Sequence, residues 1–348
     1  MGKFANLMGK GNALIDKVEG KITASRFFTA ALIIFIIVFP ILVHNRTWTH
    51  VMVMIAIYLI VTLGMSLLFG YTGQFSFAQA AFFGIGAFSS SSLTYVYKWP
   101  IWSGFLLGIV MAGLLAFIVG RPILKLKGFY LAMATLAISI IVFVLMKQLT
   151  GITGGPSGTA GIPFISIGGI SLNSPARFYV LSWAVAIVIF FFCRNLINSR
   201  TGRAMRAIKD AETAAKVMGI DTADYKAKIF ALSAILAAIG GSLYAHYIAY
   251  VSPDTFTAEA SILIIIILAV GGVYSVWGAL IGTALLIALP QVLSGFQHYS
   301  SLIYGIIVIV LMVFAPSGIL GLLENLFAQI KRFLKRSRVG SIDLEDPR

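Results

Sequence analysis

The chain has 348 residues, of which 59% are hydrophobic and 11% charged, and its mean hydropathy is +0.96. Soluble domains carry roughly 25% charged residues, so this composition excludes a soluble globular fold and indicates a helical membrane protein with several spans. The net charge of +14 would suggest nucleic acid binding in a soluble protein, but here the basic residues flank apolar runs and predict orientation in the lipid bilayer instead.

Residues 1–26 are predicted to form a basic amphipathic segment on the cytoplasmic surface of the membrane. Apolar residues such as Phe4, Leu7 and Leu14 recur at helical spacing and alternate with lysines. No small-residue cleavage site follows the first apolar run, so we do not expect a cleaved signal sequence.

Ten apolar segments follow, and each is predicted to be a membrane helix or half-helix. They comprise residues 27–43, 51–69, 77–97, 99–120, 128–147, 177–194, 226–251, 259–272, 275–293 and 301–323. Several are shorter than the about 20 residues that a span needs, so some are expected to be broken or tilted. The predicted fold is therefore all-α: a polytopic transmembrane bundle over residues 27–323, followed by a basic cytoplasmic tail, 324–348.

Orientation follows from the lysines and arginines. They gather in the N-terminal segment, in 121–127, in 194–228 and in the C-terminal tail, whereas the other loops hold few or none. Ten spans with both termini in the cytoplasm place every basic-rich loop inside. The long outer loop, 150–176, divides five spans from five and predicts two halves of opposite topology, an inverted repeat.

Two glycine-rich stretches are predicted to interrupt helices. Broken backbone at membrane depth is tolerated where it is buried in protein or lines a wet cavity. A translocation path for a polar solute and a plain turn between spans are both compatible with the first stretch, 69–80, and 271–278 makes a similar break. The substrate-path candidates are Gly70, Tyr71, Gly73, Gln74, Ser76, Gln79, Gly271, Gly272 and Ser275.

The segment 199–225 is the only long polar stretch between apolar segments. One amphipathic helix from about residue 201 is predicted, ended by Gly219, with Asp221 capping the next helix. The apolar face of that helix would comprise Met205, Ile208, Ala211, Ala215 and Met218. Such a helix is either a float on the membrane surface or a docking element for a partner.

The sequence offers little for catalysis. No Walker A sequence occurs, so ATP would have to bind a separate subunit. Few ionisable residues lie within the apolar segments, no HExxH is present, and the single cysteine, Cys193, precludes a cysteine cluster. We assign no catalytic and no metal-binding residues.

Four features occur in a familiar order: Gly70-Tyr-Thr-Gly-Gln-Phe-Ser, the loop from Leu149 to Gly158, Thr201-Gly-Arg-Ala-Met-Arg-Ala-Ile-Lys-Asp, and Gly271 through Gly282. Together they resemble the M-type permease of branched-chain amino-acid ABC importers. The resemblance implies a multi-pass protein of the bacterial cytoplasmic (inner) membrane that works with a second homologous permease, two ATP-binding subunits and an extracytoplasmic solute-binding protein. It implies no cofactor in this chain, with ATP on the partner subunits.

The resemblance also implies a cytoplasmic coupling loop of the EAA type that docks on the ATPase. Thr213 replaces the glutamate of that motif, which is offset to Glu212. The expected coupling residues are Arg203, Arg206, Asp210, Ala211, Ala214, Ala215 and Gly219. The implied solute is a branched-chain or other neutral amino acid; related permeases carry urea and short amides, and a self-contained secondary carrier is the further alternative.

Overall fold

The computed structural model describes residues 34, 36, 38, 39, 45–167, 170–296, 299–315 and 318–322. The predicted surface segment 1–26, most of the apolar segment 27–43 and the tail 324–348 lie outside the described residues. The chain divides into a unit of residues 1–49 and a unit of residues 50–348. Every tertiary contact given below lies within the second unit.

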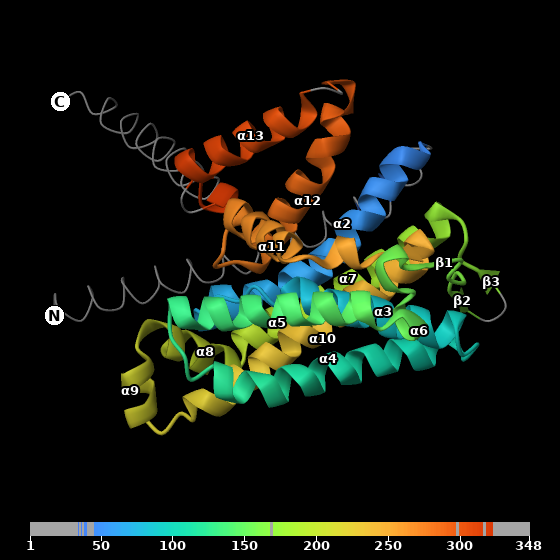
Figure 1. Cartoon of the computed structure of the whole chain (residues 1–348). Helices are drawn as coiled ribbons and strands as arrows, with labels where there is room; N and C mark the ends of the chain where they lie inside the picture. Colours follow the sequence, from blue (N-terminus) through green and yellow to red (C-terminus); the bar gives the residue numbers. More distant parts are fainter. Residues whose placement is uncertain are drawn as a thin grey trace, which may run out of the picture. The chain divides into compact units, whose positions relative to one another are not determined.

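The described chain is mostly helical (Figure 1), as predicted. Six helices are long and apolar enough to cross a membrane. They are α2 (Arg46–Met65, continued by the π-helix Ser66–Tyr71), α4 (Ile101–Ile123), α5 (Phe129–Gln148), α7 (Pro175–Asn198), α10 (Thr222–Ile248) and α12 (Val276–Val292, continued by a 3-10 turn, Leu293–Phe296).

Three shorter helices complete the set: α3 (Gln79–Tyr95), α11 (Ala258–Gly271) and α13 (Ser300–Phe314). A helix thus occupies each apolar segment predicted after residue 50. The total of ten spans and the side of the membrane on which the termini lie stay predictions.

Helices α3, α4 and α10 pack closely against one another. A Cβ placed at Gly108 of α4 would lie 3.2 Å from the Cα of Gly86 in α3, and one placed at Gly86 would lie 2.1 Å from the carbonyl oxygen of Ala238 in α10. Small residues let helix backbones approach in a membrane, where there is no water to drive association. Gly104, one turn before Gly108 in α4, is as close to α3: a Cβ at this position would lie 2.9 Å from the Cα of Ser90.

Helices α11, α12 and α13 share a second apolar cluster. Its buried members are Ile267, Val270, Leu286 and Val308. These side chains come from three helices that follow one another in the chain, so short connections are enough to bring them together.

The outer loop is more structured than an all-helical fold predicts. It contains α6 (Thr150–Thr153), a 3-10 turn (Gly155–Ser157) and the strands β1 (Thr159–Ala160), β2 (Ser166–Ile167) and β3 (Ile170–Ser171). Strands β2 and β3 pair with each other, and β1 pairs antiparallel with β4 (Tyr250–Val251), which precedes the 3-10 turn Pro253–Phe256. The loop is therefore fastened to the chain beyond α10.

A buried histidine fastens the same loop a second time. The two ring nitrogens of His246, at the end of α10, lie 2.7 Å from the carbonyl oxygen of Pro163 and 2.8 Å from Oγ of Ser90 in α3. Both polar atoms of the ring are thereby satisfied, which a fully buried imidazole requires. His246 is therefore an interior residue.

The prediction of one uninterrupted amphipathic helix in this segment is wrong. The segment forms α8 (Arg200–Asp210) and α9 (Glu212–Val217), separated at Ala211, whose φ and ψ of −155° and 86° are not helical. The break shifts the helical phase, so Met205, Ile208 and Ala215 are buried but Ala211 and Met218 are exposed. The predicted end at Gly219, with φ of +82°, and the cap by Asp221, which accepts from the Asp224 N–H at 3.1 Å, are both confirmed.

Helices α8 and α9 lie at the end of the unit opposite the four short strands (Figure 1). The turn between α4 and α5 lies at the same end, because Lys127 approaches Glu212 to 3.8 Å and Arg121 approaches Asp224 to 3.8 Å. Two of the basic-rich loops therefore share one end, as the charge pattern predicts.

Candidate functional site

The two predicted glycine breaks lie against each other. At the first break, α2 changes to a π-helix at Ser66 and ends at Tyr71, and the chain turns at Gly73, whose φ is +69°. At the second break, α11 ends at Gly271 and is followed by Gly272, whose φ is +128°. Single π-helical turns inside α-helices are frequent at functional sites. The sequence predicted both interruptions, and the structure brings them into contact.

Gly70 is the point of closest approach. A Cβ at this position would lie 2.2 Å from the carbonyl oxygen of Val273, so no residue larger than glycine fits without displacing backbone. Next to it, the Tyr71 hydroxyl donates a hydrogen bond of 3.0 Å to the carbonyl oxygen of Tyr274. The end of α2 and the turn after α11 therefore form one packed junction, which we call the break junction (residues 70–74 and 271–275).

One of the path candidates is a helix cap. Ser275 Oγ accepts from the N–H of Trp277 at 3.2 Å at the start of α12, so it satisfies an N–H group that the first turn of a helix leaves without a partner. Ser76 Oγ accepts from the N–H of Ala78 at 3.2 Å, but Ala78 is itself the N-cap of α3, so Ser76 closes a local turn before the helix and does not cap it.

The two glutamines of the first stretch differ. Gln79 is fully packed: its Nε2 donates to the carbonyl oxygen of Val61 at 3.0 Å, and its Oε1 accepts from the Ser233 hydroxyl at 3.0 Å, so it connects α3 with α2 and α10. Gln74 is 3% exposed, and neither polar atom of its amide has a hydrogen-bond partner among the described residues. An unpaired buried amide costs roughly 1–3 kcal/mol, so a hydrogen-bonding partner for Gln74 would be stabilising.

A lysine from α8 reaches the break junction. Lys209 Nζ donates to the carbonyl oxygen of Gly70 at 2.6 Å and lies 3.6 Å from the centre of the Tyr274 ring. Burial lowers the pKa of this ammonium below its usual value of 10.5, and the adjacent Asp210 carboxylate opposes that shift. Sequence reasoning placed Lys209 on the polar face of α8 and missed this contact, for which the sequence gives no signal.

Helix α8 is attached to the end of α7 as well. Arg206 donates to the carbonyl oxygen of Ile197 at 3.2 Å, while Met205 and Ile208 are buried. The predicted coupling residues Arg203 and Asp210 are exposed. The apolar face of α8 therefore packs against its own chain and is not free to lie on a membrane surface.

Glu212 holds α9 in place. Its carboxylate lies 2.9 Å from Nζ of Lys226, 3.4 Å from Lys216 and 3.8 Å from Lys127, and it accepts from the Thr222 hydroxyl at 3.3 Å. Burial alone would raise the pKa of this carboxyl group, but the hydrogen bond from Lys226 and the charges of the three lysines outweigh burial and lower the pKa. Glu212 is thus ionised and connects α9 to α10 and to the turn before α5.

Two large apolar side chains project from the end of α9. Val217 is 82% exposed and Met218 is 81% exposed. Of the predicted docking residues, Ala211, Ala214 and Gly219 are also exposed, but Ala215 is buried and cannot meet a partner. We call Val217 and Met218 the apolar knob; the pairing of two large apolar residues directly before Gly219 is the sequence signal that identifies it.

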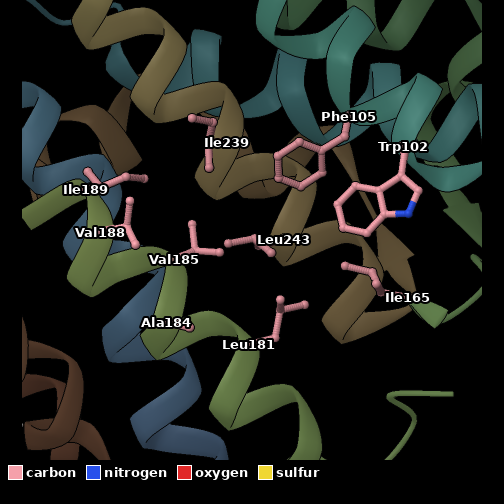
Figure 2. A pocket seen from close by; sticks show the side chains of 10 residues that line it. All are labelled: Trp102, Phe105, Ile165, Leu181, Ala184, Val185, Val188, Ile189, Ile239 and Leu243. Carbon is pink, nitrogen blue, oxygen red and sulfur yellow. The ribbon is translucent and has the colours of Figure 1, made fainter. Parts of the chain in front are cut away.

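An apolar groove of about 380 Å³ lies elsewhere, between α4, α7 and α10 (Figure 2). It is lined by Trp102, Phe105, Ile165, Leu181, Ala184, Val185, Val188, Ile189, Ile239 and Leu243. No lining side chain is charged, and only the Trp102 indole carries a polar atom. A surface of this kind suits hydrocarbon and offers nothing to the charged ends of an amino acid.

Comparison with known proteins places this geometry in context. The family described as "Branched-chain amino acid transport system / permease component" matches residues 47–315. The LivM permease protein of a high-affinity branched-chain amino acid transport system of Escherichia coli (strain K12) is 27% identical over 88% of this chain and 77% of its own length.

Two further relatives agree. A probable branched-chain amino acid transport permease protein LivM of Methanocaldococcus jannaschii is 25% identical over 76% of this chain and 90% of its own length. The LivH permease protein of Escherichia coli (strain K12), from a high-affinity branched-chain amino acid transport system, is 26% identical over 76% of this chain and 91% of its own length. All three are named as transport permeases.

Proposed function

Because the chain belongs to the family of branched-chain amino acid transport permease components, we propose that it is the membrane permease of an ATP-driven importer. It is a multi-pass membrane protein and a transport subunit, not an enzyme. The proposed solute is a branched-chain or other neutral amino acid, handed over by an extracytoplasmic binding protein in the bacterial cytoplasmic membrane. A second permease of the same family and two ATP-binding subunits would complete the importer.

The observation that carries the proposal is the apolar knob, Val217 and Met218. It projects from the basic end of the bundle, on a segment that Glu212 fixes with three lysines. Two adjacent large apolar side chains exposed to water are typical of an interaction surface. Since the chain has no Walker A sequence, the partner that fits is the ATP-binding subunit.

Docking explains the segment better than a membrane float does. A float must present a continuous apolar face to lipid. Met205 and Ile208 are buried in their own chain, and the break at Ala211 turns α9 into a separate helix. Of the large apolar side chains of α8 and α9, only those of the knob are exposed, and they form too small an apolar area to hold a helix on a bilayer.

The break junction is the proposed gate of the solute path. Gln74 and Tyr71 supply neutral hydrogen-bonding groups, and Lys209 is the charged side chain that hydrogen-bonds to the junction. A path without an excess of fixed charge suits a solute whose own charges cancel. Urea and short amides satisfy the same condition, so they belong in the solute test.

The test is a pull-down of the full chain from membranes in a mild detergent. We expect the wild-type chain to recover two ATP-binding subunits and a second permease. The double variant Val217→Ser/Met218→Ser should recover at least about tenfold less ATP-binding subunit, because truncating an interface anchor typically costs more than about 1–2 kcal/mol.

The control is Leu126→Ser, which changes an exposed apolar residue in the neighbouring turn between α4 and α5. Its recovery of partners should equal that of the wild type. Equal recovery by the double variant would refute docking through the knob, and a wild-type chain that moves solute alone in liposomes would refute the importer. Thermal shifts of the co-purified binding protein with leucine, valine, urea and acetamide would identify the solute class.

A further inference from the structure

We infer that Lys209 is the positioning residue that connects the coupling segment (residues 199–225) to the break junction. The inference rests on the proposed function for the partner that would move α8. The contact between Lys209 and the junction, which we call the tie, lies within this chain and does not depend on a partner. Lys209 lies in α8, and its ammonium contacts both halves of the junction: the carbonyl of Gly70 on the α2 side and the Tyr274 ring on the α11 side.

The contact with Gly70 is built into the end of a helix. Gly70 belongs to the last turn of the π-helix, where carbonyl groups run out of partners along the chain. A lysine ammonium at that end supplies a charge-assisted hydrogen bond and complements the negative end of the helix dipole. Lys209 thus stabilises the place where α2 stops.

The methylene chain of Lys209 also packs against the turn that follows the π-helix. A Cβ at Gly73 would lie 3.3 Å from the Cγ of Lys209, so the methylene chain packs directly over this glycine. The ammonium then meets the face of Tyr274, where a cation is attracted to the ring. The backbone of Tyr274 accepts the hydrogen bond from Tyr71, which closes the connection between the two sides.

Lys209 is not a solvated surface lysine. Its ammonium forms no ion pair with an acidic side chain of the described ranges, although Asp210 is its neighbour in sequence. A long flexible side chain loses conformational entropy when it is held in one position, so the two contacts must compensate for that loss. Among the described residues, the bond from Lys209 to Gly70 is the side-chain hydrogen bond that joins α8 to the junction.

The connection continues to the apolar knob. Ala211 ends α8 and begins α9, its N–H donates to the carbonyl of Ala207 at 3.0 Å, and its own carbonyl accepts from the N–H of Ala215 at 3.0 Å. Ala211 therefore takes part in the last backbone hydrogen bond of α8 and the first one of α9. A partner that moves Val217 and Met218 would move Lys209, and Lys209 would move the Gly70 carbonyl.

The first test uses the isolated full chain in detergent. Lys209→Met keeps the length of the side chain but removes the charge and the N–H groups, whereas Lys209→Arg keeps the charge. Amide hydrogen exchange in residues 72–76 should be roughly tenfold faster in Lys209→Met, near the wild-type rate in Lys209→Arg, and unchanged in the control Lys125→Met. Unchanged exchange in Lys209→Met would overturn the tie.

The second test uses the importer reconstituted with its ATP-binding subunits and binding protein. Lys209→Met should assemble and hydrolyse ATP as the wild type does, yet move at least about tenfold less leucine per ATP. Lys209→Arg should restore most of that ratio. A residue that only stabilises the fold would lower assembly instead and leave the ratio unchanged, so an unchanged ratio would overturn the coupling role.

A second variant covers the case in which Lys209→Met fails to fold. Tyr274→Leu removes the ring, which is 70% exposed, but leaves the carbonyl that binds Tyr71. It should lower leucine moved per ATP by roughly threefold. Failure of the wild-type chain to recover any ATP-binding subunit would refute the proposed function, while the exchange experiment would still decide whether Lys209 holds the junction.

Discussion

Gly70→Ala offers the sharpest test of the break junction. The added methyl group would lie 2.2 Å from the carbonyl oxygen of Val273, so one of the two backbones must move by roughly 1 Å or more to reach an ordinary van der Waals separation. Neither atom belongs to a flexible side chain. The displacement would also stretch the 3.0 Å hydrogen bond between Tyr71 and Tyr274.

The expected cost follows from these two effects. Overpacking typically destabilises by about 1–3 kcal/mol, and a strained hydrogen bond adds about 0.5–1.5 kcal/mol. We expect Gly70→Ala to lower the free energy of unfolding in detergent by roughly 2–4 kcal/mol. Denaturant unfolding followed by tryptophan fluorescence would measure the change.

The matched control is Gly305→Ala in α13. Nothing lies within 4 Å of a Cβ at Gly305, and its position inside a helix favours alanine by up to about 1 kcal/mol. The control should therefore be neutral or stabilising. If Gly70→Ala unfolded within about 0.5 kcal/mol of the wild type, the junction would not be packed as described.

Two further predictions concern polar groups. Glu212→Gln should destabilise the coupling segment by about 1–3 kcal/mol, seen as faster limited proteolysis within residues 199–225, because Lys226, whose side chain is 10% exposed, loses its nearest carboxylate. Since the pKa of Glu212 is lowered below 4.5, this stabilisation should be complete above pH 4.5 and should disappear as the pH falls through the lowered pKa. Glu212→Gln should show no such step in stability. An identical step in the wild type and in Glu212→Gln would refute the role given to the Glu212 carboxylate. Gln79→Leu should cost about 1–2 kcal/mol of stability while the KM for solute stays at the wild-type value, because Gln79 connects three helices; a large rise in KM would return it to the solute path.

The apolar knob and Lys209 have different proposed roles, although both belong to the segment 199–225. Variants of Val217 and Met218 are expected to act on assembly, whereas variants of Lys209 are expected to act on coupling after assembly. The two experiments therefore separate docking of a partner from transmission of its movement.

Composition and charge determined the class of this protein. Apolar runs of spanning length can be satisfied only by helices in lipid, so their number and position along the chain predict where helices lie. The glycines at 70, 73, 271 and 272 predicted both interruptions, because these residues permit backbone conformations that end a helix. Gly219 and Asp221 were predictable for the same local reasons.

Tertiary structure decided what the interruptions and the polar segment meet. No local rule brings Gly70 to Val273, or Lys209 to Gly70, since the partners are separated by more than a hundred residues and their contact depends on how helices pack. The break at Ala211 separated Met218, which is exposed, from Met205 and Ile208, which are buried, because one non-helical residue changes the phase of every residue that follows. Helical periodicity assumes an uninterrupted helix, and only the folded chain shows where that assumption ends.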